Sequence, residues 1–432
     1  MARSAFRPEF PPRVVVGWHV QSLVAIFAIL LMLIGLAPGT LANVAVAPTK
    51  IYVANAGNPS TVTVLNGSTH AVEKSIAIRN YTAVGVGVAP NGKEAYAIAV
   101  GSDEEGSPGR LVPISTASDV AGRAISVGTD PQAVSFNPNG RFAYVVNGFD
   151  AATTPASAPG TITPVNLAER LAGQPIKVGT NPGSIVISPD GRMAYVADSN
   201  AITGNPTTIT PINLATNTPE KAIHVAARAI AVTLNSQTAL ALTSNGVVPI
   251  PIATNRPGRA VGLGGVPQVV ALAPDGQTAW VLTTPDPGLA AGSKKVELTA
   301  INTATFAIGK VVTLPGMPDS GEYFIAITPN DAHIYVLGQG SGKSTSTLIA
   351  IAASTDVATR PIKVGVDDTA LVASPNSKFV YVLSPGSDYQ GPPIASQPKQ
   401  TPGSVFPIST GDQSVGAPIR AGLLSSAMAV AS

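Results

Sequence analysis

The sequence predicts an all-β protein in which one short unit repeats along most of the chain, and three observations support this prediction. From residue 44 onward, patterns such as "PGSIVISPDGRMAYVADSN" and "PQAVSFNPNGRFAYVVNGF" return with small variations. One aromatic or apolar residue marks each repeat, at intervals of 40 to 55 residues. Turn-forming residues are abundant, with 42 Gly and 39 Pro, while only 12% of the 432 residues are charged. Four-stranded units at this period are typical of a β-propeller, in which ring closure removes the exposed ends.

The N-terminal 43 residues differ in character from the rest of the chain. Three arginines between residues 3 and 13 precede the apolar run Leu23 to Ala37, and small residues ending at Ala42 follow it. A basic start, an apolar middle and a small-residue end are typical of an export signal. A run of 15 residues is shorter than the roughly 20 of a spanning helix, and an uncleaved anchor is the alternative. We expect residues 1–43 to be a signal peptide or membrane anchor, and the remainder to be extracytoplasmic, secreted or anchored to the cell surface.

Residues 44–432 form one predicted propeller domain of eight repeats. Each repeat holds two strands separated by a turn such as Pro-Asp-Gly or Pro-Asn-Gly, then two more short strands, as in "TTITPINLATNTPEKAIHV". The repeats are marked by Tyr52, Tyr96, Tyr144, Tyr195, Leu240, Trp280, Tyr335 and Tyr381. The acids of two such turns, Asp190 and Asp275, are predicted turn formers. The C-terminal "SSAMAVAS" has the pattern of an innermost strand that no second strand follows, so we expect it to complete the first blade beside "IYVAN" and lock the ring.

The repeat also resembles a known family. Its "YVAN", "YVVN" or "YVAD" strand, with a "SPDG" or "APNG" lead and a "PINLATNT" continuation, resembles the YVTN-type β-propeller repeat of surface-layer and secreted bacterial proteins. The resemblance covers residues 44 to 432 and implies the fold, but no single activity, because members of this family differ widely in function. The fifth repeat departs from the pattern with "TALALTSN", and the last two carry Gly338 and Ser384 in place of Asn. Eight repeats favour eight blades, and the family's common seven is the alternative.

One segment is similar to a phosphate-binding loop. The stretch "QGSGKS" (Gln339 to Ser344) contains part of G-x-x-x-x-G-K-[ST], but Leu337 stands where the first glycine belongs. A phosphate loop must also precede a helix whose N-terminal amides face the anion. Because this segment lies between two predicted strands, we interpret it as a hairpin loop and not as a nucleotide site.

Binding is predicted on the face of the disc that carries the long loops. Connections between second and third strands are long, as in "GFDAATTPASAP" and "SPGSDYQGPPIASQPKQTP", whereas first-to-second connections read as turns of two or three residues flanked by basic residues such as Lys93 and Arg141. Variable loops on a rigid scaffold are the usual place for binding, although the acids that gather there would also serve merely to keep the loops soluble. The candidate binding residues are Asp103, Glu104, Glu105, Asp130, Phe149, Asp150, Asp198, Asp286, Asp367, Asp368, Asp388 and Tyr389.

Composition narrows the chemistry further. The formal net charge of +2 gives no basic field for nucleic acid. The absence of cysteine excludes disulfides, thiolate metal sites and a cysteine nucleophile. The four histidines lie without metal-ligand spacing, and no G-x-S-x-G motif occurs. We therefore predict no catalytic residue, no metal and no cofactor, in a monomer that contacts the membrane only through its N-terminal segment.

The sequence thus predicts a secreted or cell-surface binding module whose partner is an unknown envelope protein or glycan. The alternative is a small-molecule hydrolase, such as a lactonase, with its site at the mouth of the central channel. Propellers resembling this family that act as lactonases or carry haem need clustered acids, arginines or histidines facing the channel, and the sequence places no such cluster there. Acidic residues converging at the channel mouth would favour the enzyme, whereas an uncharged channel would favour the binding module.

Overall fold

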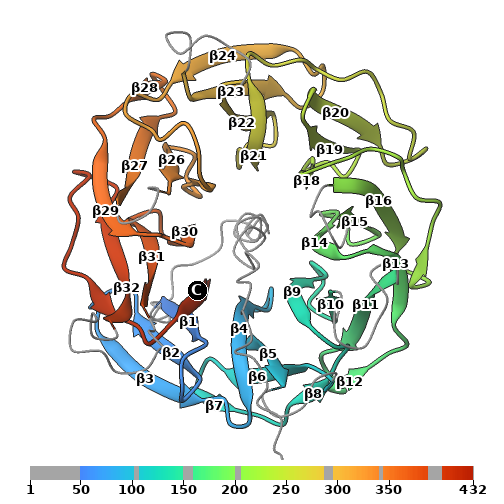
Figure 1. Ribbon diagram of the computed structural model, residues 1–432, viewed down its shortest axis with the longest axis vertical. Coiled ribbons are helices and arrows are strands. Elements are labelled where there is room, and N and C mark those ends of the chain that lie inside the picture. Colours follow the sequence, from blue (N-terminus) through green and yellow to red (C-terminus); the bar gives the residue numbers. More distant parts are fainter. Residues whose placement is uncertain are drawn as a thin grey trace, which may run out of the picture.

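The computed structural model is a ring of eight β-sheets, a single eight-bladed β-propeller (Figure 1). The structure describes residues 49–101, 107–148, 159–199, 206–286, 295–339, 344–387 and 401–431. Every regular element within these ranges is a strand, which confirms the predicted all-β fold. The ring has eight blades, so the alternative of seven is wrong. No helix in the described ranges is long and apolar enough to cross a membrane.

Within each blade the strands run antiparallel from the centre of the ring to its rim. Blade 1 holds β34 (Ser425–Ala431), β1 (Lys50–Asn55), β2 (Thr61–Asn66) and β3 (Val72–Ala77). Blade 2 holds β4 (Tyr81–Val88), β5 (Glu94–Gly101), β6 (Arg110–Ser115) and the short outer strands β7 (Val120–Ala121) and β8 (Ile125–Ser126). Blade 3 holds β9 (Pro131–Phe136), β10 (Phe142–Asn147), β11 (Pro159–Asn166), β12 (Leu171–Ala172) and β13 (Ile176–Thr180). Blade 4 holds β14 (Pro182–Ile187), β15 (Met193–Ser199), β16 (Pro206–Asn213) and β17 (Thr218–Pro219).

The second half of the ring repeats this order with one reduced blade. Blade 5 holds β18 (Ala229–Val232), β19 (Thr238–Thr243) and β20 (Gly246–Pro251), and its fourth strand is reduced to the bridge between Val247 and Val261. Blade 6 holds β21 (Val266–Leu272), β22 (Thr278–Thr284), β23 (Glu297–Asn302) and β24 (Ile308–Thr313). Blade 7 holds β25 (Tyr323–Ile327), β26 (His333–Gly338), β27 (Thr345–Ala352), β28 (Val357–Ala358) and β29 (Ile362–Val366). Blade 8 holds β30 (Ala370–Ala373), β31 (Phe379–Ser387), β32 (Thr401–Ser409) and β33 (Ile419–Arg420).

The turns between first and second strands are uniform. Each one in blades 2 to 8 spans five residues, so the expected length of two or three residues is wrong. The difference arises because an Asn or Asp side chain folds back on the turn: Asp190 Oδ1 accepts from the Arg192 amide at 3.1 Å, and Asp275 Oδ1 accepts from the Gln277 amide at 2.8 Å. The next residue is left-handed, as at Gly191, where φ is 70°. Asp190 and Asp275 are therefore turn formers, as predicted.

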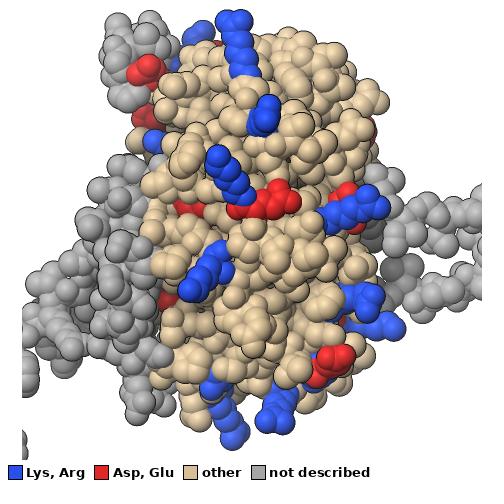
Figure 2. Space-filling view, turned by 90° about the vertical axis from the view of Figure 1, so that its right-hand side faces the viewer, with Lys and Arg blue, Asp and Glu red and all other residues tan. Residues whose placement is uncertain are grey.

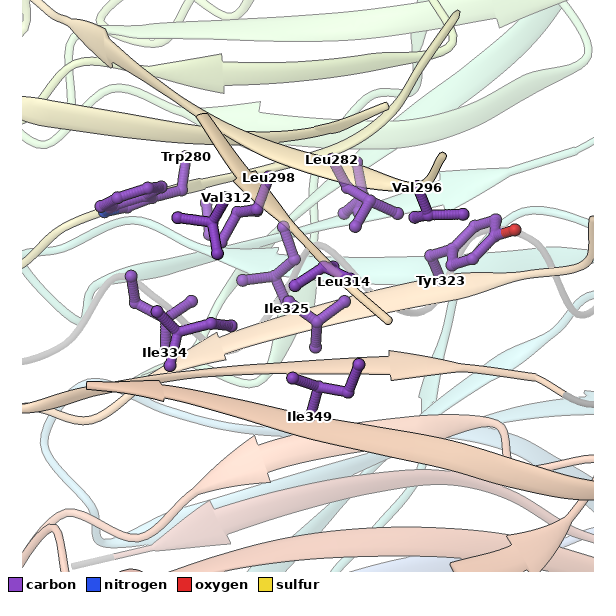
Figure 3. Close-up of a cluster of buried hydrophobic side chains, with 14 of the residues drawn as sticks. Trp280, Leu282, Val296, Leu298, Val312, Leu314, Tyr323, Ile325, Ile334 and Ile349 are labelled. Atoms are coloured by element: carbon purple, nitrogen blue, oxygen red, sulfur yellow. The ribbon is translucent and has the colours of Figure 1, made fainter. Parts of the chain in front are cut away.

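The hydrophobic core lies between blades and not at the centre of the ring. Each of the eight buried clusters draws its side chains from two adjacent blades. Figure 3 shows the cluster between blades 6 and 7, where Trp280 and Leu282 of β22 face Ile325 of β25 and Ile349 of β27. We call each such interface a seam. Since a sheet buries both faces only when it has a neighbour on each side, every blade depends on the closure of the whole ring.

The C-terminal strand closes the ring as predicted. Strand β34 pairs antiparallel with β1, from Lys50 opposite Ala431 to Asn55 opposite Ser425. The Ser425 hydroxyl also donates to Asn55 Oδ1 at 2.7 Å. The innermost strand of blade 1 thus comes from the end of the chain, and the other three come from its beginning. The segment "QGSGKS" likewise joins two strands, β26 and β27, although residues 340–343 lie outside the described residues.

In four blades the tyrosine that marks the repeat donates a hydrogen bond to the next blade, from Tyr52, Tyr144, Tyr195 and Tyr381. The hydroxyl of Tyr144 in blade 3 donates to Asn217 Oδ1 of blade 4 at 3.2 Å, and that of Tyr195 in blade 4 donates to Asn255 Oδ1 of blade 5 at 2.7 Å. Both asparagines are left-handed, with φ of 54° and 50°, a conformation that Asn adopts more readily than most residues. The ring portion of each tyrosine is buried in the seam. In these blades the repeat therefore carries its own connection to the following repeat.

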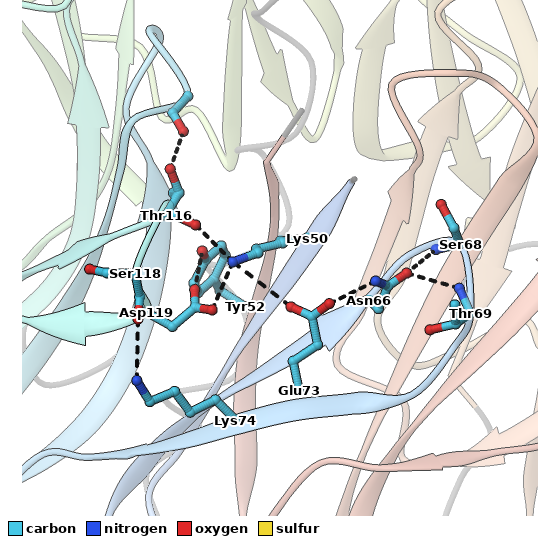
Figure 4. Close-up of polar contacts among 11 residues, drawn as sticks. Lys50, Tyr52, Asn66, Ser68, Thr69, Glu73, Lys74, Thr116, Ser118 and Asp119 are labelled. Atoms are coloured by element: carbon cyan, nitrogen blue, oxygen red, sulfur yellow. Dashed lines mark hydrogen bonds and ion pairs between the residues drawn. The ribbon is translucent and has the colours of Figure 1, made fainter. Parts of the chain in front are cut away.

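The seam between blades 1 and 2 uses charged groups for the same purpose (Figure 4). The Tyr52 hydroxyl donates to Asp119 Oδ1 at 3.1 Å, and Lys50 Nζ lies 2.7 Å from Asp119 Oδ2. Lys50 Nζ also donates to the Thr116 carbonyl at 2.8 Å and lies 3.8 Å from Glu73 Oε2. Burial, followed by the negative charge of Asp119, raises the pKa of Tyr52 far above its usual value. These contacts join β1 and β3 of the ring-closing blade to blade 2.

Candidate functional site at the long-loop face

The long connections gather on one face of the disc, which we call the long-loop face. The longest join β10 to β11, β22 to β23 and β31 to β32, and comprise residues 148–158, 285–296 and 388–400. In a blade of alternating strands, these connections emerge on the same side as the crossovers that lead from one blade to the next. The five-residue turns emerge on the opposite side, which we call the turn face. Lys93, Arg141, Arg192 and Lys378 are exposed there.

Five of the twelve predicted binding residues lie in the described part of the chain. Asp286 is exposed at the beginning of the connection after β22, and Asp130 and Asp367 are half-buried in crossovers. Asp198 and Asp368 are buried. The other seven lie outside the described residues: Asp103, Glu104, Glu105, Phe149, Asp150, Asp388 and Tyr389. The described acids therefore surround the long-loop face at separate blades and do not converge on one point.

Two of these acids lie in crossovers, at a position where the backbone must adopt a left-handed conformation. Asp130 and Asp367 each precede an innermost strand in a left-handed conformation, with φ of 48° and 54°. Asn80 and Asn181 occupy the same place in other blades, with φ of 62° and 43°. Short polar side chains are favoured in this region because they form local hydrogen bonds; Asp130 Oδ2, for example, accepts from Gln132 Nε2 at 2.7 Å. The geometry of the crossover thus explains an Asn or Asp here without a ligand.

The last residue of the "YVxN" pattern occupies a buried slot between blades. Asn147 ends β10, and its Nδ2 donates to the hydroxyls of Thr161 at 3.1 Å and Thr163 at 2.9 Å on β11. Its carboxamide lies against Gly128 in the crossover from blade 2. Asn55 makes the same pair of contacts in blade 1. We call this position the interblade slot, and it gives the Asn of the repeat a role in building the seam.

Asp198 occupies the interblade slot between blades 3 and 4. It is only 1% exposed, and its Oδ2 accepts hydrogen bonds from Thr208 at 3.0 Å and Thr210 at 2.7 Å. A Cβ atom added to Gly179 of β13 would clash with the Asp198 carboxyl group, so the glycine makes room for it. Burial raises the pKa of Asp198 to about 6, and the threonine hydroxyls and the Gly179 backbone oppose this rise. Asp198 is the acidic counterpart of Asn147.

The slot between blades 7 and 8 is filled from another part of the chain. Ser384 stands where the repeat usually has Asn, and the Asp368 side chain enters the slot from the crossover, 0% exposed, against Gly365 of β29. Neither carboxylate oxygen has a hydrogen-bond partner of good geometry. Burial raises the pKa of Asp368 to about 7, and the charge of Asp367 adds to the rise, while the nearby hydroxyls of Ser346 and Ser384 oppose it. The sequence analysis identified Ser384 as a departure from the repeat, but it did not predict that Asp368 fills the slot.

The innermost strands carry no ionisable acid, lysine, arginine or histidine in the described chain. They consist of small and apolar residues with a few Ser, Thr, Gln and Tyr. The described histidines lie elsewhere: His70 in a turn of blade 1, His224 in the crossover from blade 4 to blade 5, and His333 at the turn-face end of β26. Among the described residues, no group of three or more His, Asp and Glu could hold a metal ion. The walls of the channel thus carry no Asp, Glu, Lys, Arg or His over the described strands.

Charged and exposed apolar side chains are dispersed over the rim of the disc. Figure 2 shows Lys and Arg side chains spread singly over one side of the rim, with acidic side chains between them. Exposed apolar side chains begin the outermost strands of five blades, namely Val72, Val120, Leu171, Ile308 and Val357. Each of these five residues belongs to a different blade, and single exposed apolar side chains of this kind need no partner.

Comparison with solved structures identifies similar propellers of varied function. The chain is similar to dihydro-heme d1 dehydrogenase NirN in complex with DHE, with a TM-score of 0.63 and 13% identity over 97% of this chain and 82% of that one. It is similar to hydrazine synthase of Kuenenia stuttgartiensis, with a TM-score of 0.51 and 21% identity over 69% of this chain and 92% of that one. It is also similar to a eukaryotic initiation factor, with a TM-score of 0.53 and 12% identity over 88% and 98%. At these identities the likeness shows the fold alone. No protein family and no curated protein matches the sequence.

Proposed function

We propose that this eight-bladed propeller is an extracytoplasmic binding module of the YVTN-repeat type, which binds an envelope protein or glycan on its long-loop face. One observation carries the proposal: the described innermost strands contain no charged residue or histidine. General acid–base catalysis at the channel most often uses a His, Asp, Glu or Lys side chain within hydrogen-bonding reach of a substrate. The alternative of a lactonase-like hydrolase therefore has less support than binding by the loops.

The positions of the residues that build the seams also support binding on the long-loop face. In four blades the tyrosine of the repeat bonds to the next blade, as at Tyr195, and the Asn or Asp of the repeat fills the interblade slot, as at Asn147. The first-to-second connections of blades 2 to 8 all span five residues, with a left-handed residue at the fourth position. By contrast, the connections between second and third strands range from the two residues between β19 and β20 to the thirteen between β31 and β32. Such variation on a rigid scaffold is typical of binding surfaces.

The proposed localisation rests on the N-terminal segment. Its basic residues, apolar run and small-residue end are those of an export signal or anchor. An envelope partner follows from that localisation, because a propeller outside the cytoplasm meets envelope proteins and glycans first.

The test compares the two faces of the disc. Residues 149–158 and 388–400 would each be replaced by Gly-Asn, and retention of the protein by an isolated cell-envelope fraction would be measured. We expect the loop variants to lose retention and a matched turn-face variant, with Lys93, Arg141 and Arg192 all changed to Ser, to keep it. Circular dichroism would check that each variant is folded. Loss of retention in the turn-face variant alone would assign binding to the opposite face, and hydrolysis of a lactone panel by the intact chain would favour the enzyme.

A further inference from the structure

We propose that Asp198 and Asp368 are pH-responsive latches, which hold two opposite seams of the ring closed when their carboxyl groups are neutral and loosen those seams when the groups ionise. Asp198 lies in the seam between blades 3 and 4, and Asp368 lies in the seam between blades 7 and 8. In a ring of eight blades these seams are four apart, so they face each other across the disc. Loosening both would separate the ring into two groups of four blades.

The geometry of the slots provides the first argument. In blades 1 and 3 the slot holds a neutral carboxamide, whose Nδ2 donates to two threonine hydroxyls. Asp198 has the same surroundings, with the hydroxyls of Thr208 and Thr210 as donors, and its Oδ1, like that of Asn147, is buried without a hydrogen-bond partner; the difference is that the Asp198 side chain can ionise. A buried carboxylate needs compensation by hydrogen bonds or a cation. The ionised form of Asp198 is compensated by the threonine hydroxyls and the Gly179 backbone, and by no charged group among those that act on it in the described chain.

The negative charge of an ionised Asp368 would be compensated even less than that of Asp198. Both of its carboxylate oxygens are buried without a well-formed hydrogen bond. The groups that face it are the hydroxyls of Ser346 and Ser384, the backbone of Gly365 and the carboxylate of Asp367. The only one of these that carries a charge is Asp367, and its charge is of the same sign. Ionisation of Asp368 therefore places a second negative charge beside the first in a water-excluded seam.

The direction of the effect follows from linkage. Because burial raises the pKa of both groups, to about 6 for Asp198 and about 7 for Asp368, the folded chain holds their protons more tightly than the unfolded chain does. The stabilising contribution of the neutral carboxyls is complete below the ordinary value of 3.8 and is lost as the pH rises through 6 and 7. The ring is thus expected to be tightest in mildly acidic surroundings and loosest above neutral pH. Both latches lie at the long-loop end of their seams, where such loosening would reach the proposed binding surface.

The test uses the full chain and internal controls that the repeat itself supplies. Asp198→Asn recreates the slot of Asn55 and Asn147, and Asn147→Asp installs the proposed latch in a third seam. Amide hydrogen exchange at pH 5 and pH 8, corrected for intrinsic rates, would be followed at Gly179, Gly365 and Gly128. For the natural chain we expect protection at Gly179 and Gly365, but not at Gly128, to fall by at least about tenfold between the two pH values.

Each variant has a distinct expected result. Asp198→Asn should remove the pH dependence at Gly179 and leave that at Gly365, whereas Asn147→Asp should create one at Gly128. Asp368→Asn should act on Gly365 alone, and if it fails to fold, the other two variants still decide the matter. Equal protection of the natural chain at both pH values, or an unchanged pH dependence in Asp198→Asn, would overturn the proposal.

Discussion

The ring should depend strongly on one side chain of its last strand, because β34 is joined to the rest of blade 1 by pairing and packing alone. Met428 pairs with Val53 in β1 and is 6% exposed, in the seam between blades 8 and 1 with Leu383 and Val405. Truncation of a buried methionine to alanine typically destabilises a protein by about 2–5 kcal/mol, which is a large part of a typical total of about 5–15 kcal/mol. Met428→Ala should therefore lower the stability of the whole ring.

The assay is urea denaturation followed by circular dichroism, with Ser426→Ala as the matched control. Ser426 is half-buried in the same strand, and its hydroxyl contributes one long hydrogen bond, 3.3 Å to the Ala54 carbonyl. Its loss should destabilise the protein by about 1 kcal/mol or less. Removal of residues 425–432 should lower the urea midpoint further, because the edge of β1 and one face of each adjacent blade become exposed. If Met428→Ala is no more destabilising than Ser426→Ala, closure by β34 does not stabilise the ring as argued.

Three other outcomes are expected. N-terminal sequencing of the mature protein from the producing cell should begin between about residues 38 and 48, and recovery of the intact chain from the cytoplasm would contradict export. Asp119→Ala should destabilise the ring by about 3 kcal/mol, because it leaves the Lys50 ammonium and the Tyr52 hydroxyl without their buried partner. If urea denaturation shows a decrease in the free energy of unfolding of less than about 1 kcal/mol, this reasoning is wrong. Because burial raises the pKa of Asp198 from 3.8 to about 6, this residue alone should lower the free energy of unfolding by up to about 3 kcal/mol between pH 4 and pH 8, and the total fall should be smaller in Asp198→Asn than in the natural chain.

The fold could be predicted from the sequence because each repeat encodes a local sheet and its link to the next one. The tyrosine that marks the period, such as Tyr144 or Tyr195, is also the residue that enters the seam. The eight marking residues therefore predicted eight blades, and the strand-like C-terminal segment predicted closure of the ring at β1; the structure confirms both. The turns were longer than expected because an Asn or Asp side chain accepts a hydrogen bond from the backbone amide two residues further on. This bond orders five residues outside the strands, which the sequence pattern does not show.

The buried acids could not be predicted, because their surroundings come from residues far apart in the sequence. Asp198 read as a loop acid, but it is buried by two threonines of the next strand and a glycine of the preceding blade. Asp368 fills a slot that is vacant only because Ser384, in another strand, is smaller than Asn. In blade 7 the Met317 side chain, from the preceding crossover, lies beside Gly338. Only the three-dimensional register of adjacent blades connects these residues.

The seams also determine where this protein can vary without loss of the ring. A residue at the tyrosine position or in the interblade slot contacts two blades, so a change there alters a seam and, through ring closure, every other blade. The connections between second and third strands begin beyond the slot residues, as after Ser199 in blade 4, and their length ranges from two to thirteen residues within one ring. A loop attached at two adjacent positions of a closed sheet can lengthen at little energetic cost, because the cost of closing it grows only slowly with its length. Specificity for a partner therefore has room to arise on the long-loop face, while the acids in the slots connect the stiffness of that face to the pH around it.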